Sequence, residues 1–364
     1  NLAIAPDGTT VAFAVNEDGL SRVYLIDTKS GALSPVDLPE PGVLGSLRFP
    51  RDRSDVLFLS ADTSRSPSDI FSYDLKERTF TRWTRSEVGG LDTSTFAVPE
   101  LVRYPSTDDV TVPAFYYKPK RKDADVADAR TPVLIIWHGG PEGQSRPSFS
   151  PLVQHLVNDL GIAVLLPNVR GSDGYGKAYL AMDDGVKREE SLADIGATLD
   201  WIASQPDLDT DRVAVYGGSY GGYMVLACAT FYPERIHAVI DVVGISSLPS
   251  FLKNTQAYRR DLRRREYGDE RDPVVREVQE RISPLNHVDK IRCDLFVQQG
   301  KNDPRVPQSE AEQIVHAVRQ RHDGDAGAVW YFLALDEGHG FAKKANRDQA
   351  LFATVLFLRE KLLK

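Results

Sequence analysis

The sequence predicts an α/β fold with a mainly parallel sheet, preceded by a smaller all-β region. From about residue 98 onward, short apolar runs alternate with helical patterns, which is typical of a parallel sheet covered by helices on both faces. The first ~85 residues instead alternate short β-type runs with turn signals and contain no long helical period. The length of 364 residues suits one large domain and a smaller one.

The N-terminal region contains two similar units of short strands. In each unit a turn precedes an apolar β-type run, and the alternating strand that follows ends on an aspartate. These aspartates, Asp27 and Asp74, lie 47 positions apart, and a repeat of about that length built from short strands is typical of β-propeller blades. Propellers typically close with about four to eight blades. We therefore expect residues 1–88 to be about two blades of a truncated propeller whose upstream segment is missing; the alternative is a small β domain with two similar hairpins.

We place the second domain at residues 89–364. A hairpin strand at 110–117 and a charged surface loop at 120–130 come first. The predicted strands then follow at 133–137, 162–166, 212–216, 238–243, 294–298 and 329–335, and the predicted helices at 148–160, 190–204, 219–232, 308–321 and 345–363. The helix at 190–204 has one apolar face, formed by Leu192, Ile195, Leu199 and Ile202. A charged, helix-prone insertion at 246–285 interrupts the alternation, and we expect it above the strand ends.

The most informative stretch is Gly217-Gly218-Ser219-Tyr220-Gly221, a G-x-S-x-G pattern. It directly follows a β-branched apolar run and precedes a helical pattern, which is the context of a nucleophile elbow. In such an elbow, a sharp strand-to-helix turn holds a serine hydroxyl above the sheet. The glycines permit the strained backbone and a close approach of strand and helix. The pattern therefore predicts Ser219 as a nucleophile.

An acid and a histidine follow the serine in the chain order of an α/β hydrolase. Asp303 lies in a loop after the predicted strand at 294–298, and the glycine-flanked His339 lies in a loop after the strand at 329–335. The chemistry requires both, because a serine hydroxyl is a poor nucleophile until an imidazole removes its proton, and a carboxylate must orient that imidazole. We expect Asp303 to be the acid and His339 the base.

Other acids and histidines could compete for these roles. Asp294 lies within a predicted strand, while Asp336 and Glu337 are too close to His339 in sequence to come from a separate loop. His316 lies in an amphipathic run and His322 in the polar stretch that ends it. We interpret both histidines as ordinary surface or helix-face residues.

An oxyanion hole requires two hydrogen-bond donors near the developing negative charge. The backbone N–H of Tyr220 follows from the elbow geometry. The second donor should come from His138-Gly139-Gly140, after the first strand of the alternating region, where lipases and esterases carry an H-G-G-type motif. We expect the N–H of Gly139 or Gly140 to serve; the alternative is that these glycines only make a tight turn. We interpret His138 as structural.

Composition limits the remaining function classes. The net charge of -8 argues against nucleic acid as the main partner. The basic run at 259–265 is better interpreted as a solvated helix face than as a polyanion site. No apolar stretch approaches the roughly 20 residues of a membrane span, so we expect no membrane partner. No signal peptide is visible, but the upstream segment is expected to be missing, so this absence says little about the compartment. We expect a cytoplasmic location.

The sequence predicts neither a metal site nor a cofactor site. No cysteine and histidine cluster has the spacing of metal ligands. The two cysteines, Cys228 and Cys293, are expected to be buried small hydrophobes without a disulfide. The glycine-rich stretch at 171–176 lacks the ending of a phosphate-binding loop, so we interpret it as a shaped loop near the site.

Together, these motifs resemble the prolyl oligopeptidase family of serine peptidases, and the closest likeness is to its acylaminoacyl-peptidase branch. The likeness covers residues ~100 to 364 strongly and the β repeats loosely. It is carried by the motifs at 138–141 (HGGP), 168–176 (NVRGSDGYG), 217–222 (GGSYGG), 283–285 (SPL), 300–307 (GKNDPRVP) and 338–341 (GHGF).

The resemblance implies an α/β-hydrolase domain beneath a β-propeller that restricts entry to short peptides, with Ser219, Asp303 and His339 as the triad. In prolyl oligopeptidases an arginine two residues after the triad acid holds a substrate carbonyl. The matching residue here is Arg305, with Val306 beside it as a pocket wall.

The chain departs from the family pattern in two places. Prolyl oligopeptidase itself uses a tyrosine hydroxyl in the oxyanion hole, whereas the matching position here is His138, so the resemblance favours the backbone amide of Gly140, as in the acylaminoacyl branch. The paired glutamates that bind a free amino terminus in dipeptidyl-peptidase relatives belong to the propeller, most of which is expected to be missing. Exopeptidase character is therefore left open.

From these arguments we expect a serine peptidase that hydrolyses short peptides through an acyl-enzyme on Ser219, of the acylaminoacyl-peptidase or oligopeptidase type and without a cofactor. One alternative is a carboxylesterase, because the same constellation cleaves esters. The other is a non-catalytic propeller scaffold with a relic hydrolase domain. Assembly of the peptidase into a homo-oligomer is left open.

Overall fold

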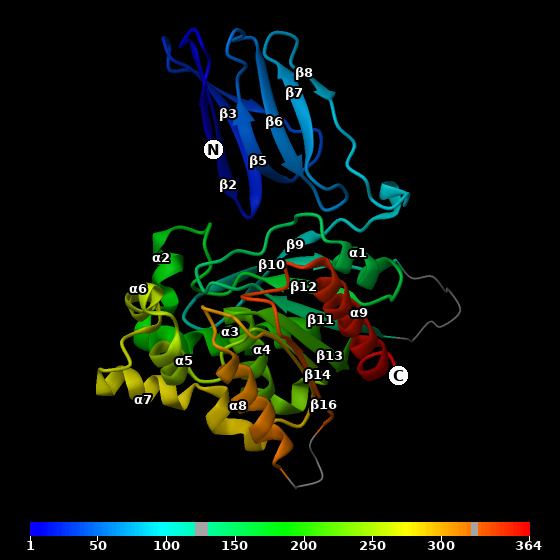
Figure 1. Cartoon of the computed structure of the whole chain (residues 1–364). Coiled ribbons are helices and arrows are strands. Elements are labelled where there is room, and N and C mark those ends of the chain that lie inside the picture. The colour runs from blue at the N-terminus through cyan, green and yellow to red at the C-terminus, as the bar shows by residue number, and fades with distance from the viewer. Residues whose placement is uncertain (121–129, 322–326) are drawn as a thin grey trace. The chain divides into compact units, whose positions relative to one another are not determined.

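The computed structural model describes residues 1–120, 130–321 and 327–364. These residues form two compact units (Figure 1), each taken separately below. The first unit comprises residues 1–100, 117–119 and 146–160, and the second comprises 101–116, 120–145 and 161–364. Most of the charged loop predicted at 120–130 lies outside the described residues.

The first unit contains two four-stranded antiparallel sheets, in each of which consecutive strands pair. This arrangement confirms the prediction of two similar β units, because a four-stranded antiparallel sheet is the blade of a propeller. The first sheet contains β1 (Leu2–Ile4), β2 (Thr10–Glu17), β3 (Leu20–Asp27) and β4 (Leu33–Val36). The second contains β5 (Val43–Arg48), β6 (Val56–Asp62), β7 (Asp69–Asp74) and β8 (Thr79–Arg82).

Helix α1 (Pro151–Asn158) belongs to the first unit because its polar side chains are bonded there. The side chain of Gln154 donates to the carbonyl oxygens of Ser64 at 2.7 Å and Ala97 at 3.0 Å. The helix is shorter than the predicted span of 148–160, since Ser150 caps its first turn by accepting from the N–H of Val153 at 3.3 Å.

The second unit is built on one eight-stranded sheet in the order β16-β15-β14-β13-β11-β12-β10-β9. The six strands from β11 to β16 pair in parallel, which confirms the predicted parallel sheet. The order reverses at β11, and ligands of such sheets bind at the carboxyl ends of the strands near that reversal. The strands are β9 (Glu100–Pro105), β10 (Thr111–Tyr117), β11 (Thr131–Trp137), β12 (Ala163–Pro167), β13 (Leu208–Gly218), β14 (Ala238–Val242), β15 (Asp294–Gly300) and β16 (Val329–Ala334).

Helices cover both faces of this sheet, and every residue of β14 is buried as a result. Helix α4 packs against β13 and β14, while α9 packs against β14 and β15. The predicted insertion at 246–285 contains the three helices α5, α6 and α7. The helices are α2 (Lys177–Leu180), α3 (Ser191–Ser204), α4 (Tyr220–Phe231), α5 (Leu248–Asn254), α6 (Ala257–Tyr267), α7 (Pro273–Arg281), α8 (Gln308–Arg319) and α9 (Lys344–Lys361).

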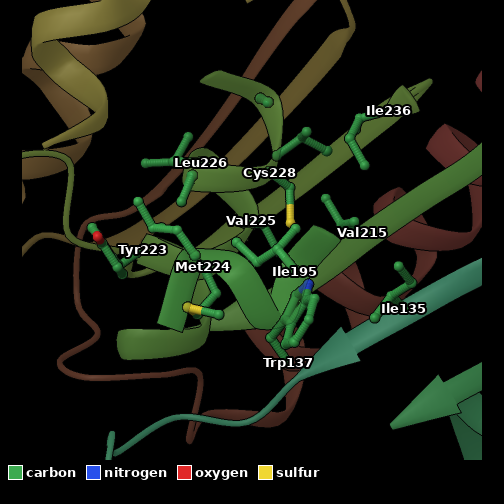
Figure 2. Close-up of a cluster of buried hydrophobic side chains, with 14 of the residues drawn as sticks. Ile135, Trp137, Ile195, Val215, Tyr223, Met224, Val225, Leu226, Cys228 and Ile236 are labelled. Carbon is green, nitrogen blue, oxygen red and sulfur yellow. The ribbon is translucent and has the colours of Figure 1, made fainter. Parts of the chain in front are cut away.

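The core of the second unit surrounds α4, which is apolar and buried almost all round. Figure 2 shows Met224, Val225 and Cys228 of this helix among Trp137, Val215 and Ile195. The predicted apolar face of α3 is confirmed, because Leu192, Ile195, Leu199 and Ile202 are all buried. Both cysteines are buried free thiols, also as predicted. This close packing holds the turn before α4 in place.

None of the helices in the described part of the chain is long and apolar enough to cross a membrane.

Candidate active site

Ser219 lies at the sharp turn between β13 and α4. Its backbone has φ 60° and ψ -115°, a strained conformation for a residue with a side chain. The turn is too tight for side chains around it: a Cβ on Gly217 would lie 2.2 Å from the carbonyl oxygen of Gly221, and one on Gly221 would lie 2.2 Å from that of Trp137. The N–H of Ser219 donates to the carbonyl oxygen of Val242 at 2.9 Å. The glycines of the motif are therefore required by close backbone approach.

Asp303 and His339 come from the loops after β15 and β16 and are hydrogen-bonded to each other. Nδ1 of His339 lies 2.7 Å from Oδ2 of Asp303. The other carboxylate oxygen accepts the backbone N–H groups of Arg305 at 2.8 Å and Val306 at 3.0 Å. The Asp303 side chain is completely buried and that of His339 is 15% exposed. With Nδ1 donating to the carboxylate, Nε2 is the ring nitrogen left to accept a proton.

Ser219 and His339 line one pocket of about 260 Å³. The predicted residues Gly140, Arg305 and Val306 line it as well, together with Gly139. The structure thus brings five of the seven predicted site residues to one cavity, and Asp303 lies beneath it against His339. The remaining one, Tyr220, is buried as the first residue of α4, so its N–H is a first-turn donor with no acceptor inside the helix.

The rival acids are engaged elsewhere. Asp294 accepts the N–H of Ala328 at 2.6 Å and pairs with Lys361 at 3.3 Å. Asp336 pairs with Lys343, and the carboxylate of Glu337 accepts the N–H of that same lysine at 2.8 Å.

The rival histidines do not reach the pocket lining either. His316 lies on α8 and is absent from the lining among the described residues. His322 lies outside the part of the chain that the structure describes.

The loop after β11 carries the second predicted oxyanion donor. Gly140 has φ +143°, and a Cβ there would lie 2.5 Å from the backbone nitrogen of Gly143, so only glycine fits. Nδ1 of His138 lies 2.9 Å from the carbonyl oxygen of Gly139, and its Nε2 lies 2.8 Å from Oγ of Ser172. Because the carbonyl oxygen only accepts, Nδ1 is the protonated nitrogen. Burial lowers the pKa of His138, which favours this neutral ring.

The bond from His138 also orients the peptide unit between Gly139 and Gly140. In a trans peptide the N–H points opposite to the C=O. Fixing the Gly139 carbonyl on the imidazole therefore directs the N–H of Gly140 to the other side of the loop. The Gly140 carbonyl is itself held by Nη1 of Arg263 at 3.3 Å. Through Ser172, His138 connects the loop after β11 to the glycine-rich stretch at 171–176. The sequence predicted that stretch near the site.

Sequence reasoning missed four residues that line the pocket: Phe251, Arg259, Arg263 and Tyr267. All four lie on α5 and α6 of the insertion. Two arginines of the basic run at 259–265, which we interpreted from its sequence as a solvated helix face, line the pocket: Arg259 and Arg263. Their spacing of four residues puts them on one side of α6, and that spacing was the available signal.

A buried arginine that contacts the pocket-lining Tyr267 was also missed. The guanidinium of Arg188 lies between two rings, 5.1 Å from the centre of Tyr220 and 4.8 Å from that of Tyr267. It pairs with Asp183 and donates to the carbonyl oxygen of Glu266 at 3.0 Å. Burial raises the pKa of Asp183 to about 6, although the arginine opposes this. Arg188 therefore joins the first residue of α4 to the end of α6.

Within the described residues, no group of three or more histidine, cysteine, aspartate or glutamate side chains could hold a metal ion.

Known sequences similar to this chain include peptidases. A family model described as "Prolyl oligopeptidase family" matches residues 147–364. "Dipeptidyl aminopeptidase BIII" of Pseudoxanthomonas mexicana is 33% identical over 319 residues, which cover 85% of this chain and 45% of the relative. "Dipeptidyl peptidase family member 6" of Caenorhabditis elegans is 30% identical over 342 residues, which cover 85% and 44%. The chain thus spans less than half the length of these two relatives.

Solved structures with the same fold include two peptidases. A puromycin-hydrolyzing peptidase of Mycobacterium tuberculosis matches with a TM-score of 0.86 at 23% identity, over 99% of this chain and 53% of that one. The acylaminoacyl peptidase of Pyrococcus horikoshii matches with a TM-score of 0.81 at 21% identity, over 97% and 54%. At these identities the likeness establishes the fold, an α/β hydrolase unit with β-propeller strands.

Proposed function

Since the chain belongs to the prolyl oligopeptidase family of serine peptidases, we propose that it hydrolyses short peptides through an acyl-enzyme on Ser219. The observation that carries this proposal is the 2.7 Å hydrogen bond between His339 and Asp303, at a pocket that Ser219 also lines. A serine at an elbow, an imidazole with a free Nε2 and a buried carboxylate are the groups that acyl transfer requires.

In the proposed reaction, Oγ of Ser219 attacks the carbonyl carbon of the substrate while Nε2 of His339 removes the hydroxyl proton. Asp303 stabilises the imidazolium that forms. The N–H groups of Tyr220 and Gly140 bind the negatively charged oxygen of the tetrahedral intermediate. His339 then protonates the leaving amine, and the peptide bond breaks. A water molecule then attacks the acyl-enzyme ester through the same steps, which releases the acid and restores Ser219.

The two alternative functions are weaker. A carboxylesterase has the same catalytic groups, but it has no use for propeller blades upstream of its hydrolase unit. A relic scaffold would not be expected to retain the hydrogen bond between His339 and Asp303. The location proposed with this function is the cytoplasm. Assembly of the peptidase into a homo-oligomer is part of the same proposal.

Fluorophosphonate labelling combined with peptide turnover tests the proposal. A fluorophosphonate probe should modify Ser219, as mapped by mass spectrometry of the digested protein, and should abolish hydrolysis of a blocked dipeptide anilide. Heat-denatured protein is the control for non-specific labelling. Labelling of Ser219 together with turnover of esters only would favour the carboxylesterase, and an unmodified Ser219 would favour the relic scaffold.

Replacing Arg305 by alanine tests its proposed grip on a substrate carbonyl. The Arg305 side chain is exposed and lines the pocket, while its backbone is held by Asp303 and by Thr255. A guanidinium hydrogen bond to a carbonyl contributes about 1.5–3 kcal/mol. We expect Arg305→Ala to lower kcat/KM for peptides by about 10- to 150-fold. An aryl acetate has no such carbonyl and should be hydrolysed almost as before; equal losses on both substrates would mean that Arg305 only braces the loop of Asp303.

A further inference from the structure

The catalytic pocket contains positive charge that the described protein does not neutralise. Among the described residues, the side chains of Arg259 and Arg305 make no ion pair and no hydrogen bond with another protein group, although both line the pocket. Two other arginines of the basic run differ: Arg263 pairs with Glu266, and Arg264 pairs with Glu270. The pocket therefore presents two free guanidinium groups beside Ser219.

No carboxylate among the described residues that line this pocket offsets that charge. The acid nearest to the chemistry, Asp303, is buried and fully engaged. One of its oxygens faces His339, and the other accepts the N–H groups of Arg305 and Val306. An anionic group of a substrate would thus meet two unpaired guanidiniums without a competing protein carboxylate.

The two arginines lie on segments that are bonded together. The N–H of Gln256, at the start of α6, donates to the carbonyl oxygen of Pro304 at 3.3 Å. The hydroxyl of Thr255 donates to the carbonyl oxygen of Arg305 at 2.8 Å. These bonds join the beginning of α6 to the Arg305 loop, so Arg259, in the first turn of α6, is held near that loop.

One turn further along α6, Arg263 is fixed in a different role. It pairs with the buried Glu266 and donates to the carbonyl oxygen of Gly140 at 3.3 Å. This anchors α6 to the loop proposed to supply the oxyanion donor. Arg263 is therefore paired within the protein. Arg259 lies four residues earlier on the same side of the helix, and its guanidinium is available to a ligand.

We propose that this pocket selects peptides with a carboxylate next to the scissile bond, and that Arg259 binds that carboxylate. Arginine suits this role because its planar guanidinium pairs with a carboxylate through two parallel hydrogen bonds. The carboxylate has two chemical sources: the side chain of an acidic residue that precedes the scissile bond, or the free terminus of a single amino acid that leaves. The inference rests on the proposed peptidase function and names its substrate class.

Matched substrate pairs separate charge from shape. The first pair is acetyl-Ala-Glu-anilide and acetyl-Ala-Gln-anilide, and the second is acetyl-Ala-Ala-Ala with a free terminus and with a terminal amide. At low salt we expect kcat/KM of the wild-type protein to favour the carboxylate member of one pair by about tenfold or more, equivalent to about 1.4 kcal/mol. The pair that shows the preference identifies the source of the carboxylate.

Variants of α6 assign the preference to Arg259. In Arg259→Gln the preference should fall to near one, because the charge is lost while hydrogen-bonding capacity remains. Arg259→Lys should retain part of it. Arg265→Gln is the matched control, since Arg265 is an exposed arginine of the same helix outside this pocket. If Arg259→Gln lowered kcat/KM equally for both members of each pair, Arg259 would have only a structural role and the proposal would be overturned.

A binding measurement keeps the inference separate from the peptidase function. Calorimetry on the Ser219→Ala protein should show tighter binding of acetyl-Ala-Glu-amide than of acetyl-Ala-Gln-amide, or of acetyl-Ala-Ala-Ala than of its terminal amide. The difference should vanish when Arg259→Gln is added. If the wild-type protein turns over no peptide but this difference persists, the peptidase function fails and the carboxylate site stands. If neutral and carboxylate ligands bind and react alike, the carboxylate site fails while turnover preserves the peptidase.

Discussion

Replacing Ser219 by alanine should lower the rate of peptide hydrolysis by about 10⁴- to 10⁶-fold, the usual range for loss of a triad nucleophile. The substitution removes one oxygen atom from a residue whose backbone is held at φ 60° by close packing of the surrounding glycines. Alanine tolerates that backbone about as well as serine does. We therefore expect the melting temperature and the circular dichroism spectrum to stay close to those of the wild type.

The matched control for this variant is Ser309→Ala, which removes an exposed hydroxyl from α8. It should leave kcat unchanged. More than about one tenth of the wild-type activity in Ser219→Ala protein would exclude Ser219 as the nucleophile, provided that the preparation is free of wild-type enzyme.

The substitution Asp303→Asn should lower kcat by roughly 10⁴-fold with little change in fold, as expected when the triad imidazole is held in the wrong tautomer. The structure explains why asparagine would impose the wrong tautomer. One oxygen of Asp303 accepts two backbone N–H groups, from Arg305 and Val306. The carbonyl oxygen of an asparagine would take that place, which turns its NH₂ group toward Nδ1 of His339. The imidazole would then carry its proton on Nε2, where it can no longer accept one from Ser219.

The control for this variant is Asp294→Asn. Asp294 begins β15, at the opposite end of the strand from the Asp303 loop, and pairs with Lys361. It should leave kcat near the wild-type value. A loss of less than about tenfold in Asp303→Asn would mean that another group orients His339. The NMR chemical shifts of the two ring nitrogens would then report which tautomer is present.

The parallel sheet and the triad candidates could be predicted from the sequence because their signals are local. The strands are continuous apolar runs, since a strand of a parallel sheet is buried on both faces. The elbow needs glycines within a few positions of Ser219, and its motif therefore appears intact in the chain. Asp303 and His339 each follow a strand directly, and the carboxyl ends of parallel strands meet at one edge of the sheet. Local pattern plus strand direction is enough to bring these three residues together.

The boundaries of the helices and strands were harder to predict from the sequence. The helix predicted at 148–160 is shorter because Ser150 forms a cap, and the strand at β9 was not predicted at all. Such limits depend on single hydrogen bonds and on which neighbour a segment finds in the sheet. Periodicity over ten or more residues does not contain that information.

The sequence by itself determined the fold class and the order of the candidate catalytic groups, whereas the tertiary structure alone decided what surrounds them. Arg259 and Arg264 look alike in the chain, yet Arg264 is neutralised by Glu270 and Arg259 faces the pocket without a described partner. His138 is fixed by Ser172, 34 residues away. A charged side chain takes its role from the charges packed around it. Those charges come from segments far apart in the chain, so no local pattern records them.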